Sequence, residues 1–237
     1  MVRRTRSAVL ARGQSRQITD TMPVPSLKLD HLTIIAPTLE EGVAHVRNQI
    51  GLGMQAGGTH PEMGTHNSLL RLSNDVFLEV IASDPAAHRP ARSRWFGLDE
   101  TETVRSAWDE GRRLRGWVAR TSDLDTVLAR HGAVLGLKTR VSRGDRSWFF
   151  SVLPDGSLPA GGLAPPVIDW GHRGSPVSSM PDVGASLMSF LIEHPDPTWV
   201  LDFYARLGVA NPPEVRQGAQ LRYRAMIQTP SGTKELR

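Results

Sequence analysis

The feature that most constrains the fold is an internal repeat, weak in residue identity but consistent in its order of segments. An ungapped alignment that places Leu39 on Leu124 also places Leu29 on Leu114, so the period is 85 residues (124 − 39). Each copy begins with a strand-like segment, passes into a segment with helical apolar spacing, and continues with further strand-like segments. The repeated order of strand, helix and three strands predicts an α+β fold built from similar modules.

The first copy, residues 27–84, carries clear signals for where its elements begin and end. Residues 27–37 alternate and then become continuously apolar, which predicts a strand. Thr38 stands at the N-cap position of the helix that follows, ahead of acidic residues that favour the positive end of a helix dipole. Asn74 and Asp75 separate two strand-like runs and predict a hairpin.

The second copy spans residues 114–171, and Asp123 is its expected helix cap. Between the copies, residues 85–113 predict a connector that carries a short helix. A third, incomplete copy, of strand-helix-strand-strand order, is expected over residues 184–237 and is expected to pack on the same domain formed by residues 27–183.

The charge distribution argues against nucleic acid as a partner. Residues 1–26 hold five arginines and one acid (5 − 1 = +4), and the whole chain is also +4, so residues 27–237 are formally neutral. A phosphate-binding surface needs basic residues on the folded body. The segment 1–26 has too few apolar residues to fold alone, which predicts a disordered basic tail, or a chain whose true start is Met22 and not Met1.

Composition also indicates the cellular compartment and the partners to expect for this chain. The absence of cysteine excludes disulfides and thiolate metal sites, and it fits a reducing, cytoplasmic location. No apolar run approaches the roughly 20 residues that a membrane-spanning helix needs. The first residues also lack the apolar centre of a secretory signal. We therefore expect neither a membrane nor a nucleic acid among its partners.

Three stretches together resemble a known family: "LDHLTIIAP", "GGTHPEMGTHNSLLRLSNDVFLEVIASDP" and "VIDWG". They are similar to glyoxalase-like proteins of the vicinal oxygen chelate (glyoxalase/bleomycin resistance/dioxygenase) superfamily, and the likeness covers residues 29–209. It implies βαβββ modules, two of which pair their sheets into a cup. In many members a divalent metal sits in that cup, with ligands from the first and last strands of each module.

Carried over residue by residue, the resemblance implies an incomplete set of metal ligands. The first module offers His31 and Glu79, and the second offers Asp169 at its last strand. Gly116 stands at the fourth position and has no side chain to bind with, so His60, His66 or water would complete the shell. One histidine and two carboxylates suit zinc, iron(II), manganese or magnesium, and nickel is also compatible.

Strand parity tests these assignments independently, because residues two apart in a strand share a face. His31 then lies opposite Leu32, Glu79 lies opposite Leu78, and Asp169 lies opposite Ile168 and Trp170. Each polar residue is thus expected on the face away from the apolar stripe that packs under the helices. Simpler roles stay open: a hydrogen-bonded strand histidine for His31, a salt bridge to Arg71 or Arg120 for Glu79, and a turn cap for Asp169.

Other residues are candidates for catalysis and substrate binding. Glu79 and His60 are the expected bases, because a base beside a Lewis acid works near neutral pH. The glycine-rich block at residues 57–70 is expected at the rim of the cup, or else as a turn-rich connection that satisfies its own backbone. The expected substrate-binding residues are His66, Asn67, Arg120 and Trp148.

Two functions compete at this stage. The first is a divalent-metal-dependent isomerase, lyase or dioxygenase that acts on a small oxygen-bearing organic molecule. The second is a metal-free protein of the same fold that binds a small molecule, as resistance-type members of the superfamily do, and Gly116 favours it. An interaction or scaffold protein has less support, and a homodimer is expected because superfamily cups often form between chains.

Overall fold

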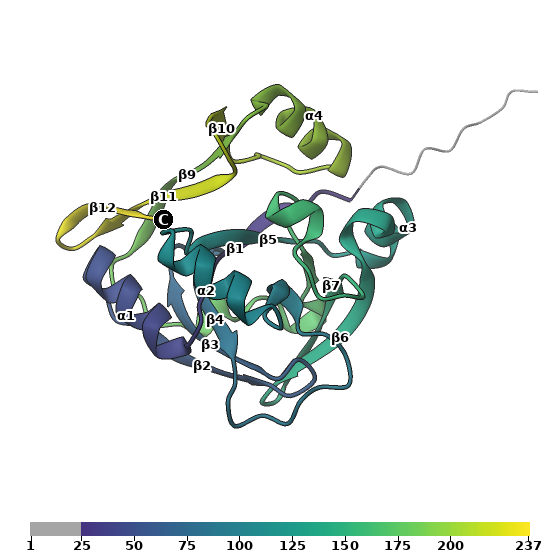
Figure 1. Ribbon diagram of the computed structural model, residues 1–237, viewed down its shortest axis with the longest axis horizontal. Helices are drawn as coiled ribbons and strands as arrows, with labels where there is room; N and C mark the ends of the chain where they lie inside the picture. The colour runs from purple at the N-terminus through teal and green to yellow at the C-terminus, as the bar shows by residue number, and fades with distance from the viewer. Residues whose placement is uncertain (1–24) are drawn as a thin grey trace, which may run out of the picture.

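The computed structural model describes residues 25–237, so nearly all of the expected tail at residues 1–26 lies outside the described residues. The strands and helices follow the order that the repeat predicts (Figure 1). The first module comprises β1 (Lys28–Ile35), α1 (Leu39–Ile50), β2 (Gln55–His60), β3 (Thr65–Arg71) and β4 (Phe77–Ser83). The second comprises β5 (Leu114–Arg120), α3 (Leu124–Leu135), β6 (Leu137–Arg143), β7 (Arg146–Val152) and β8 (Val167–Asp169).

The two modules share one curved sheet of eight strands, in the order β2-β3-β4-β1-β5-β8-β7-β6. The first strands of the modules, β1 and β5, pair antiparallel at its centre, and each also pairs parallel with the last strand of its own module. The sheet curls until its two ends meet, where Ser142 Oγ donates a 2.6 Å hydrogen bond to Glu62. The predicted cup is therefore nearly closed into a barrel.

The predicted caps form as expected. Thr38 Oγ1 accepts a hydrogen bond from the backbone N–H of Glu41, and Gly51 ends α1 in the left-handed conformation with φ of 74°. In the second module, the carboxylate of Asp123 accepts from the backbone N–H of Thr126 at the start of α3. Local sequence signals thus determine where both module helices begin.

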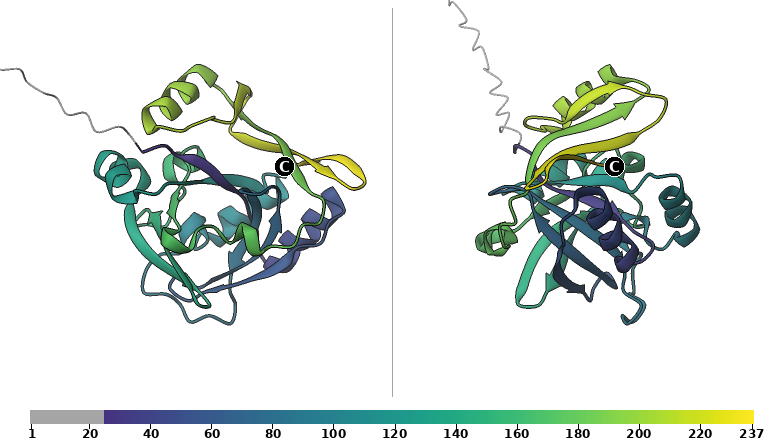
Figure 2. Two further views of the ribbon diagram at one scale, coloured as in Figure 1. Left: turned by 180° about the vertical axis from the view of Figure 1, so that it is seen from behind. Right: turned by 90° about the vertical axis from the view of Figure 1, so that its left-hand side faces the viewer.

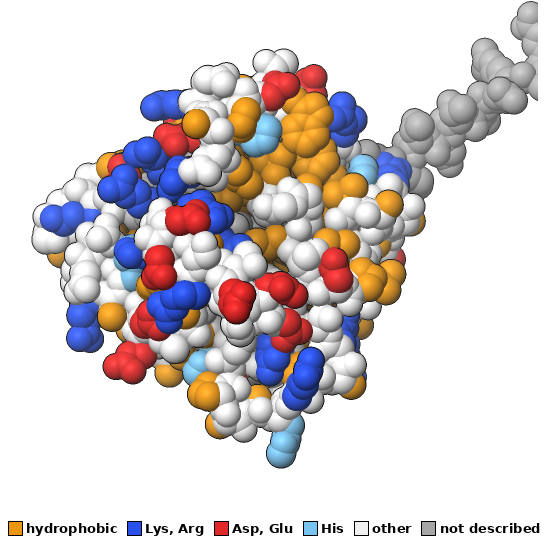
Figure 3. Space-filling model, in the orientation of Figure 1, with side chains coloured by type: hydrophobic (Ala, Val, Ile, Leu, Met, Phe, Trp, Pro, Cys, Tyr) orange, Lys and Arg blue, Asp and Glu red, His pale blue; other side chains and the backbone are white. Residues whose placement is uncertain are grey.

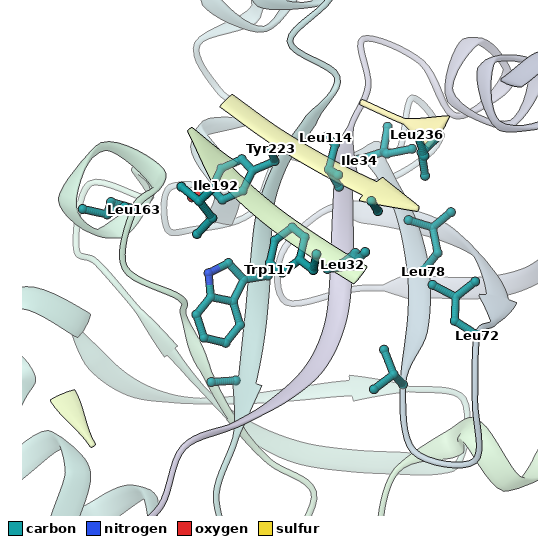
Figure 4. Close-up of a cluster of buried hydrophobic side chains, with 14 of the residues drawn as sticks. Leu32, Ile34, Leu72, Leu78, Leu114, Trp117, Leu163, Ile192, Tyr223 and Leu236 are labelled. Atoms are coloured by element: carbon teal, nitrogen blue, oxygen red, sulfur yellow. The ribbon is translucent and has the colours of Figure 1, made fainter. Parts of the chain in front are cut away.

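The two faces of the sheet support separate apolar cores. Leu32, Leu78 and Trp117 point to the convex face, which the helices and a second sheet cover (Figure 4). Ile35, Ile81 and other residues of opposite parity fill the concave face. This division is the one that strand parity predicts, and it leaves the polar residues His31 and Glu79 on the concave side.

The second sheet belongs to the C-terminal unit and packs on the convex face (Figure 2). Its elements are β9 (Ser186–His194), α4 (Pro197–Leu207), β10 (Glu214–Gln217), β11 (Arg222–Thr229) and β12 (Gly232–Leu236). The strand order is β10-β9-β11-β12. The sequence predicts only two strands after the helix, and the structure has three, because the exposed, polar β10 (EVRQ) has no apolar alternation to reveal it.

The connector between the modules fills the mouth of the cup. It carries the short 3₁₀ helix η1 (Trp95–Gly97) and α2 (Thr101–Asp109), which is the expected short helix. Trp95, Phe96 and Val104 join the concave core, and Phe96 adopts a left-handed backbone with φ of 58°. Of the helices in residues 25–237, none is long and apolar enough to cross a membrane.

Candidate active site

A β-bulge in β1 places two consecutive polar residues on the concave face. The register with β5 shifts by one residue between Leu29 and His31, so Asp30 is the extra residue. A bulge re-aims a side chain that strand alternation would send to the other face. Asp30 is fully buried, and its carboxylate bonds His31 Nδ1 at 2.7 Å and accepts from Trp170 Nε1 at 2.9 Å.

From Asp30 the polar contacts continue across the concave face in one chain. His31 Nε2 lies 3.3 Å from Glu79 Oε2, which reaches it from the neighbouring strand β4. The other oxygen of Glu79 accepts a 2.6 Å hydrogen bond from the Asn67 amide. Asn67 in turn accepts a longer bond, 3.4 Å, from the guanidinium of Arg143. The chain therefore places His31 between two carboxylates and links Glu79 to Arg143 through the neutral amide of Asn67.

These contacts set the protonation of the central pair. Burial alone would lower the pKa of His31, but its hydrogen bonds and charge interactions with Asp30 and Glu79 outweigh burial and raise the pKa to about 9. Burial would raise the pKa of Glu79, yet the hydrogen bond and charge of His31 lower the pKa to about 2. At neutral pH the imidazole is a cation held between two carboxylates.

His60 lies in the same cavity in the opposite charge state. Burial, helped by the positive charge of Arg143, lowers the pKa of His60 to about 4, so its ring is neutral. Its Nδ1 bonds Thr65 Oγ1 at 3.1 Å, and the same hydroxyl accepts from Trp95 Nε1. His60 also meets the rings of Trp95 and Trp148 edge-on. It is therefore a fixed, uncharged part of the wall.

Aromatic side chains enclose the polar chain. Three tryptophans line the cavity, namely Trp95, Trp148 and Trp170. The cavity volume of about 20 Å³ leaves room for one water-sized occupant. Trp148 Nε1 is buried with no hydrogen-bond partner in the described part of the chain. Since a buried donor is costly to leave unpaired, this N–H is available to an oxygen of a ligand.

The structure brings together five of the eight residues that the sequence singles out: His31, His60, Asn67, Glu79 and Trp148. Three others lie elsewhere. His66 stands between His60 and Asn67 in the hairpin but has the opposite parity, so it faces away. Arg120 bonds the side chain of Asp75 at 2.6 Å and lies 4.0 Å from Asp30 at the end of the polar chain. Neither Arg120 nor Arg71 pairs with Glu79, whose cationic partner is His31.

Asp169 does not join His31 and Glu79. In β8 its neighbours Ile168 and Trp170 face the cavity, so the carboxylate points the other way. There it accepts a 2.9 Å bond from the backbone N–H of Gly171 and caps the turn that follows. The parity argument is correct for β1 and β4. It fails for β8, because Ile168 belongs to the concave core and not to the apolar stripe that packs under the helices.

The donor set does not fit a divalent metal. With Asp169 turned away and Gly116 at the remaining position, only His31 and Glu79 of the four module positions face the cup. His60 lines the same cavity, yet residues 25–237 contain no group of three or more side chains that could hold an ion. Zinc sites, both structural and catalytic, use at least three protein ligands. The guanidinium of Arg143, which lines the same cavity, also brings a competing positive charge.

Four contributors named above were not among the sequence candidates: Asp30, Trp95, Arg143 and Trp170. Asp30 carried a signal, because the pair Asp30-His31 interrupts the apolar alternation between Leu29 and Leu32, as a bulge does. The sequence around Arg143 and Trp95 gave no local signal, because the positions of these residues depend on how β6 and the connector fold back over the sheet.

The paired modules, with a buried polar chain on the concave face, define a protein of the vicinal oxygen chelate fold. The chain belongs to the glyoxalase-like domain family, whose sequence model matches residues 29–208. The resemblance drawn from the sequence is thereby confirmed. Among curated proteins, none matches the chain.

One solved structure shares this fold, and two others are weaker matches. A hypothetical protein from Staphylococcus aureus superposes with a TM-score of 0.58 at 12% identity, covering 83% of this chain and 88% of that chain. A variant of Streptomyces coelicolor methylmalonyl-CoA epimerase in complex with 2-nitronate-propionyl-CoA gives 0.38 at 18% identity, covering 62% and 97%. A variant of 4-hydroxymandelate synthase from Streptomyces coelicolor gives 0.39 at 16% identity, covering 88% and 62%.

Proposed function

We propose that the cup is the active site of a metal-independent enzyme that moves a proton on a small organic molecule bearing a carbonyl or carboxylate oxygen. The observation that carries this proposal is the buried contact of 3.3 Å between His31 Nε2 and Glu79 Oε2. It sets a protonated imidazole beside an ionised carboxylate in an aromatic cavity with an unpaired tryptophan donor. A cation and a base at that separation can act on adjacent atoms of one substrate.

The proposed step is an enolisation that conserves atoms and charge. Glu79 takes a proton from the carbon beside the carbonyl, and the electron pair moves onto the carbonyl oxygen. His31 donates its Nε2–H to that oxygen and stabilises the new negative charge, while Asp30 holds Nδ1 and fixes the orientation of the ring. Trp148 and Asn67 offer further N–H groups. Return of the proton to either face of the carbon gives isomerisation or epimerisation.

Entry of such a substrate requires the connector to move. The cavity of about 20 Å³ cannot hold an organic molecule, and Trp95 and Phe96 of η1 form part of its wall. Their segment is attached through loops, and Phe96 has a strained left-handed backbone. We therefore propose that η1 closes the cup and moves out of it when substrate enters.

A metal-free binding protein of the same fold is the second candidate, and one observation favours it. Glu79 has a pKa of about 2, and a carboxylate so acidic is a weak base for abstracting a proton from carbon. In that case His31, Asn67 and Trp148 would bind the oxygens of a ligand without catalysing a reaction. For the metal-dependent enzyme that the family resemblance implies, only His31 and Glu79 of the four ligand positions are in place.

Tryptophan fluorescence gives a direct test, because three indoles line the cavity. A panel of small keto and carboxylic acids would be titrated into the protein, and a saturable change is expected for members that enter the cup. Each binder would then be incubated with protein in deuterated solvent, and exchange at the carbon beside the carbonyl followed by NMR. Exchange with the parent and not with Glu79→Gln supports the enzyme. Binding without exchange supports the binding protein, and no binder in the panel contradicts both.

A further inference from the structure

A second cavity, of about 450 Å³, lies outside the cup where α1, the start of β5 and the C-terminal strand β11 meet. Figure 3 shows Lys and Arg side chains gathered on this face, close to β11 and β12. The described residues that line the cavity include one acid, Glu110, and six arginines: Arg112, Arg113, Arg115, Arg222, Arg224 and Arg237. We refer to it as the arginine cavity.

Half of these arginines are neutralised by nearby carboxylates. Arg112 pairs with Glu110 at 2.8 Å, and Arg224 pairs with Glu193 at 3.1 Å. Arg237 lies 3.8 Å from Glu235. For Arg113, Arg115 and Arg222, no carboxylate of residues 25–237 lies within ion-pair distance, although Glu110 interacts with Arg222 from further away. Three positive charges in one cavity are therefore not held in ion pairs by the described chain.

The contacts of Arg113 and Arg222 are with neutral groups that hold them in place. Arg113 donates to His45 Nδ1 at 3.0 Å, and its guanidinium stacks over the Trp108 ring at 5.0 Å. Burial, with the charge of Arg113, lowers the pKa of His45, so the ring accepts this bond as a neutral group. Arg222 lies 2.8 Å from the side-chain amide of Gln220. Both guanidinium groups are thus oriented without being neutralised.

Arg115 reaches the cavity because of a second β-bulge. The register between β1 and β5 shifts again where Thr33 pairs with Gly116 and Ile34 pairs with Leu114, and Arg115 is the residue left over. Its Nη1 is buried and has no hydrogen-bond partner in the described part of the chain. An unpaired, buried guanidinium nitrogen is costly, and a bound anion would offset that cost.

We propose that the arginine cavity is a binding site for a small organic phosphate, separate from the cup. Guanidinium groups bind phosphate oxygens through paired N–H donors, and a phosphate monoester brings nearly two negative charges and three acceptor oxygens to one point. The volume of about 450 Å³ exceeds what inorganic phosphate would fill and is typical of small-molecule pockets. Leu158 and Leu221 supply apolar wall for the organic part.

The test uses the full-length protein and a pair of probes with the same ring. Phenyl phosphate and phenyl sulfate share their shape but differ in charge, and binding would be measured by isothermal titration calorimetry at low salt. We expect one saturable site that prefers phenyl phosphate at least about tenfold, since the second charge adds a further interaction with the arginines. Replacement of Arg115 or Arg222 by Gln should each weaken phenyl phosphate binding by about tenfold or more.

Arg140→Gln is the matched control, because it removes the same charge from an exposed position on β6 away from the cavity. It should leave the affinity within about twofold. If Arg115→Gln, the variant in the β-bulge, fails to fold, Arg222→Gln still tests the proposal. The proposal is overturned when phenyl phosphate shows no saturable binding, when phenyl sulfate binds equally well, or when Arg140→Gln weakens binding as much as Arg222→Gln.

Discussion

Asp30 and Glu79 hold the imidazole of His31 from both sides, and this arrangement couples the chemistry of the cup to its stability. The folded pKa of His31, about 9, lies above its unfolded value of about 6.5. The stabilisation is therefore complete below about pH 6.5 and is lost as the pH rises through about 9. For Glu79, with a folded pKa of about 2, it is present above about pH 4.3 and lost at lower pH.

The first prediction at this scale concerns pH. The free energy of unfolding of the parent should fall on the order of 2 kcal/mol between pH 6 and pH 10 through the deprotonation of His31. His31→Asn has no titrating ring and should lack this component. Urea unfolding of both proteins at several pH values measures it. A parent and variant with parallel pH profiles would show that folding does not raise the pKa of His31.

The second prediction separates the charge of Glu79 from its shape. Glu79→Ala leaves the His31 cation buried beside a void, and it should cost about 3–5 kcal/mol of stability. Glu79→Gln keeps the volume and the hydrogen bond to Asn67 through its carbonyl, so its loss should be smaller. Urea unfolding at pH 7 compares the two. Equal, small losses would mean that the carboxylate has no charged partner.

At the scale of single elements, sequence patterns predict regular structure well and irregular structure poorly. Thr38 and Asp123 identify the starts of both module helices, because capping depends on neighbours in sequence. The alternation in β1 and β4 identifies the faces on which Leu32, His31 and Glu79 lie. Pattern reasoning fails at Asp169, because the three-residue strand β8 is too short to show which of its faces is concave.

The two bulges mark the limit of that reasoning. Both Asp30 and Arg115 are extra residues in the β1–β5 pair, and each carries a charge to a place that simple alternation would not give it. The interruption of the pattern at Asp30 is visible in the sequence. The final position of a bulged side chain, however, depends on the partner strand and on elements that fold over it, such as the connector and the C-terminal unit.

Helix α3 offers a prediction with a matched pair of glycines. Gly136, just after the helix, has φ of +90°, and an added Cβ would lie 2.3 Å from the carbonyl oxygen of Val152. Gly136→Ala should cost about 2–3 kcal/mol through clash and backbone strain. Gly132 lies inside the helix with open space around it. Gly132→Ala should stabilise by about 0.5–1 kcal/mol. Chemical denaturation measures both, and similar effects of the two changes would refute the stated turn geometry.

At the scale of the whole molecule, the repeat predicts two modules with the same order of elements, and the family resemblance implies that they pair into a cup. Neither predicts how tightly the cup is closed. That property depends on Trp95 and Phe96, which the connector brings from outside both copies. The position of the C-terminal unit is likewise a matter of tertiary packing. Tyr204 donates a 2.8 Å bond to the backbone of Leu163, and Tyr223 bonds the backbone of Gly162.

This packing makes the C-terminal unit part of the main core. Phe190 and Tyr204 both contact Trp117 on the convex face of the sheet. A chain that ends at residue 183 would expose that face, so it should aggregate or lose cooperative unfolding. Size-exclusion chromatography and thermal unfolding of residues 25–183 beside the full chain test this. A monomeric, cooperatively unfolding fragment would show that the unit is a separable domain. The same chromatography on the full chain tests the expected homodimer.

The central claim is that the cup works through the Asp30–His31–Glu79 array and not through a metal held by the protein. The most direct measurement is elemental analysis of the untagged, full-length protein after incubation with zinc, iron(II), manganese, magnesium or nickel and removal of excess ion. The account predicts no stoichiometric metal, and no difference between the parent and His31→Ala or Glu79→Ala. One equivalent of metal in the parent, lost in both variants, would contradict it and restore the metal-dependent enzyme.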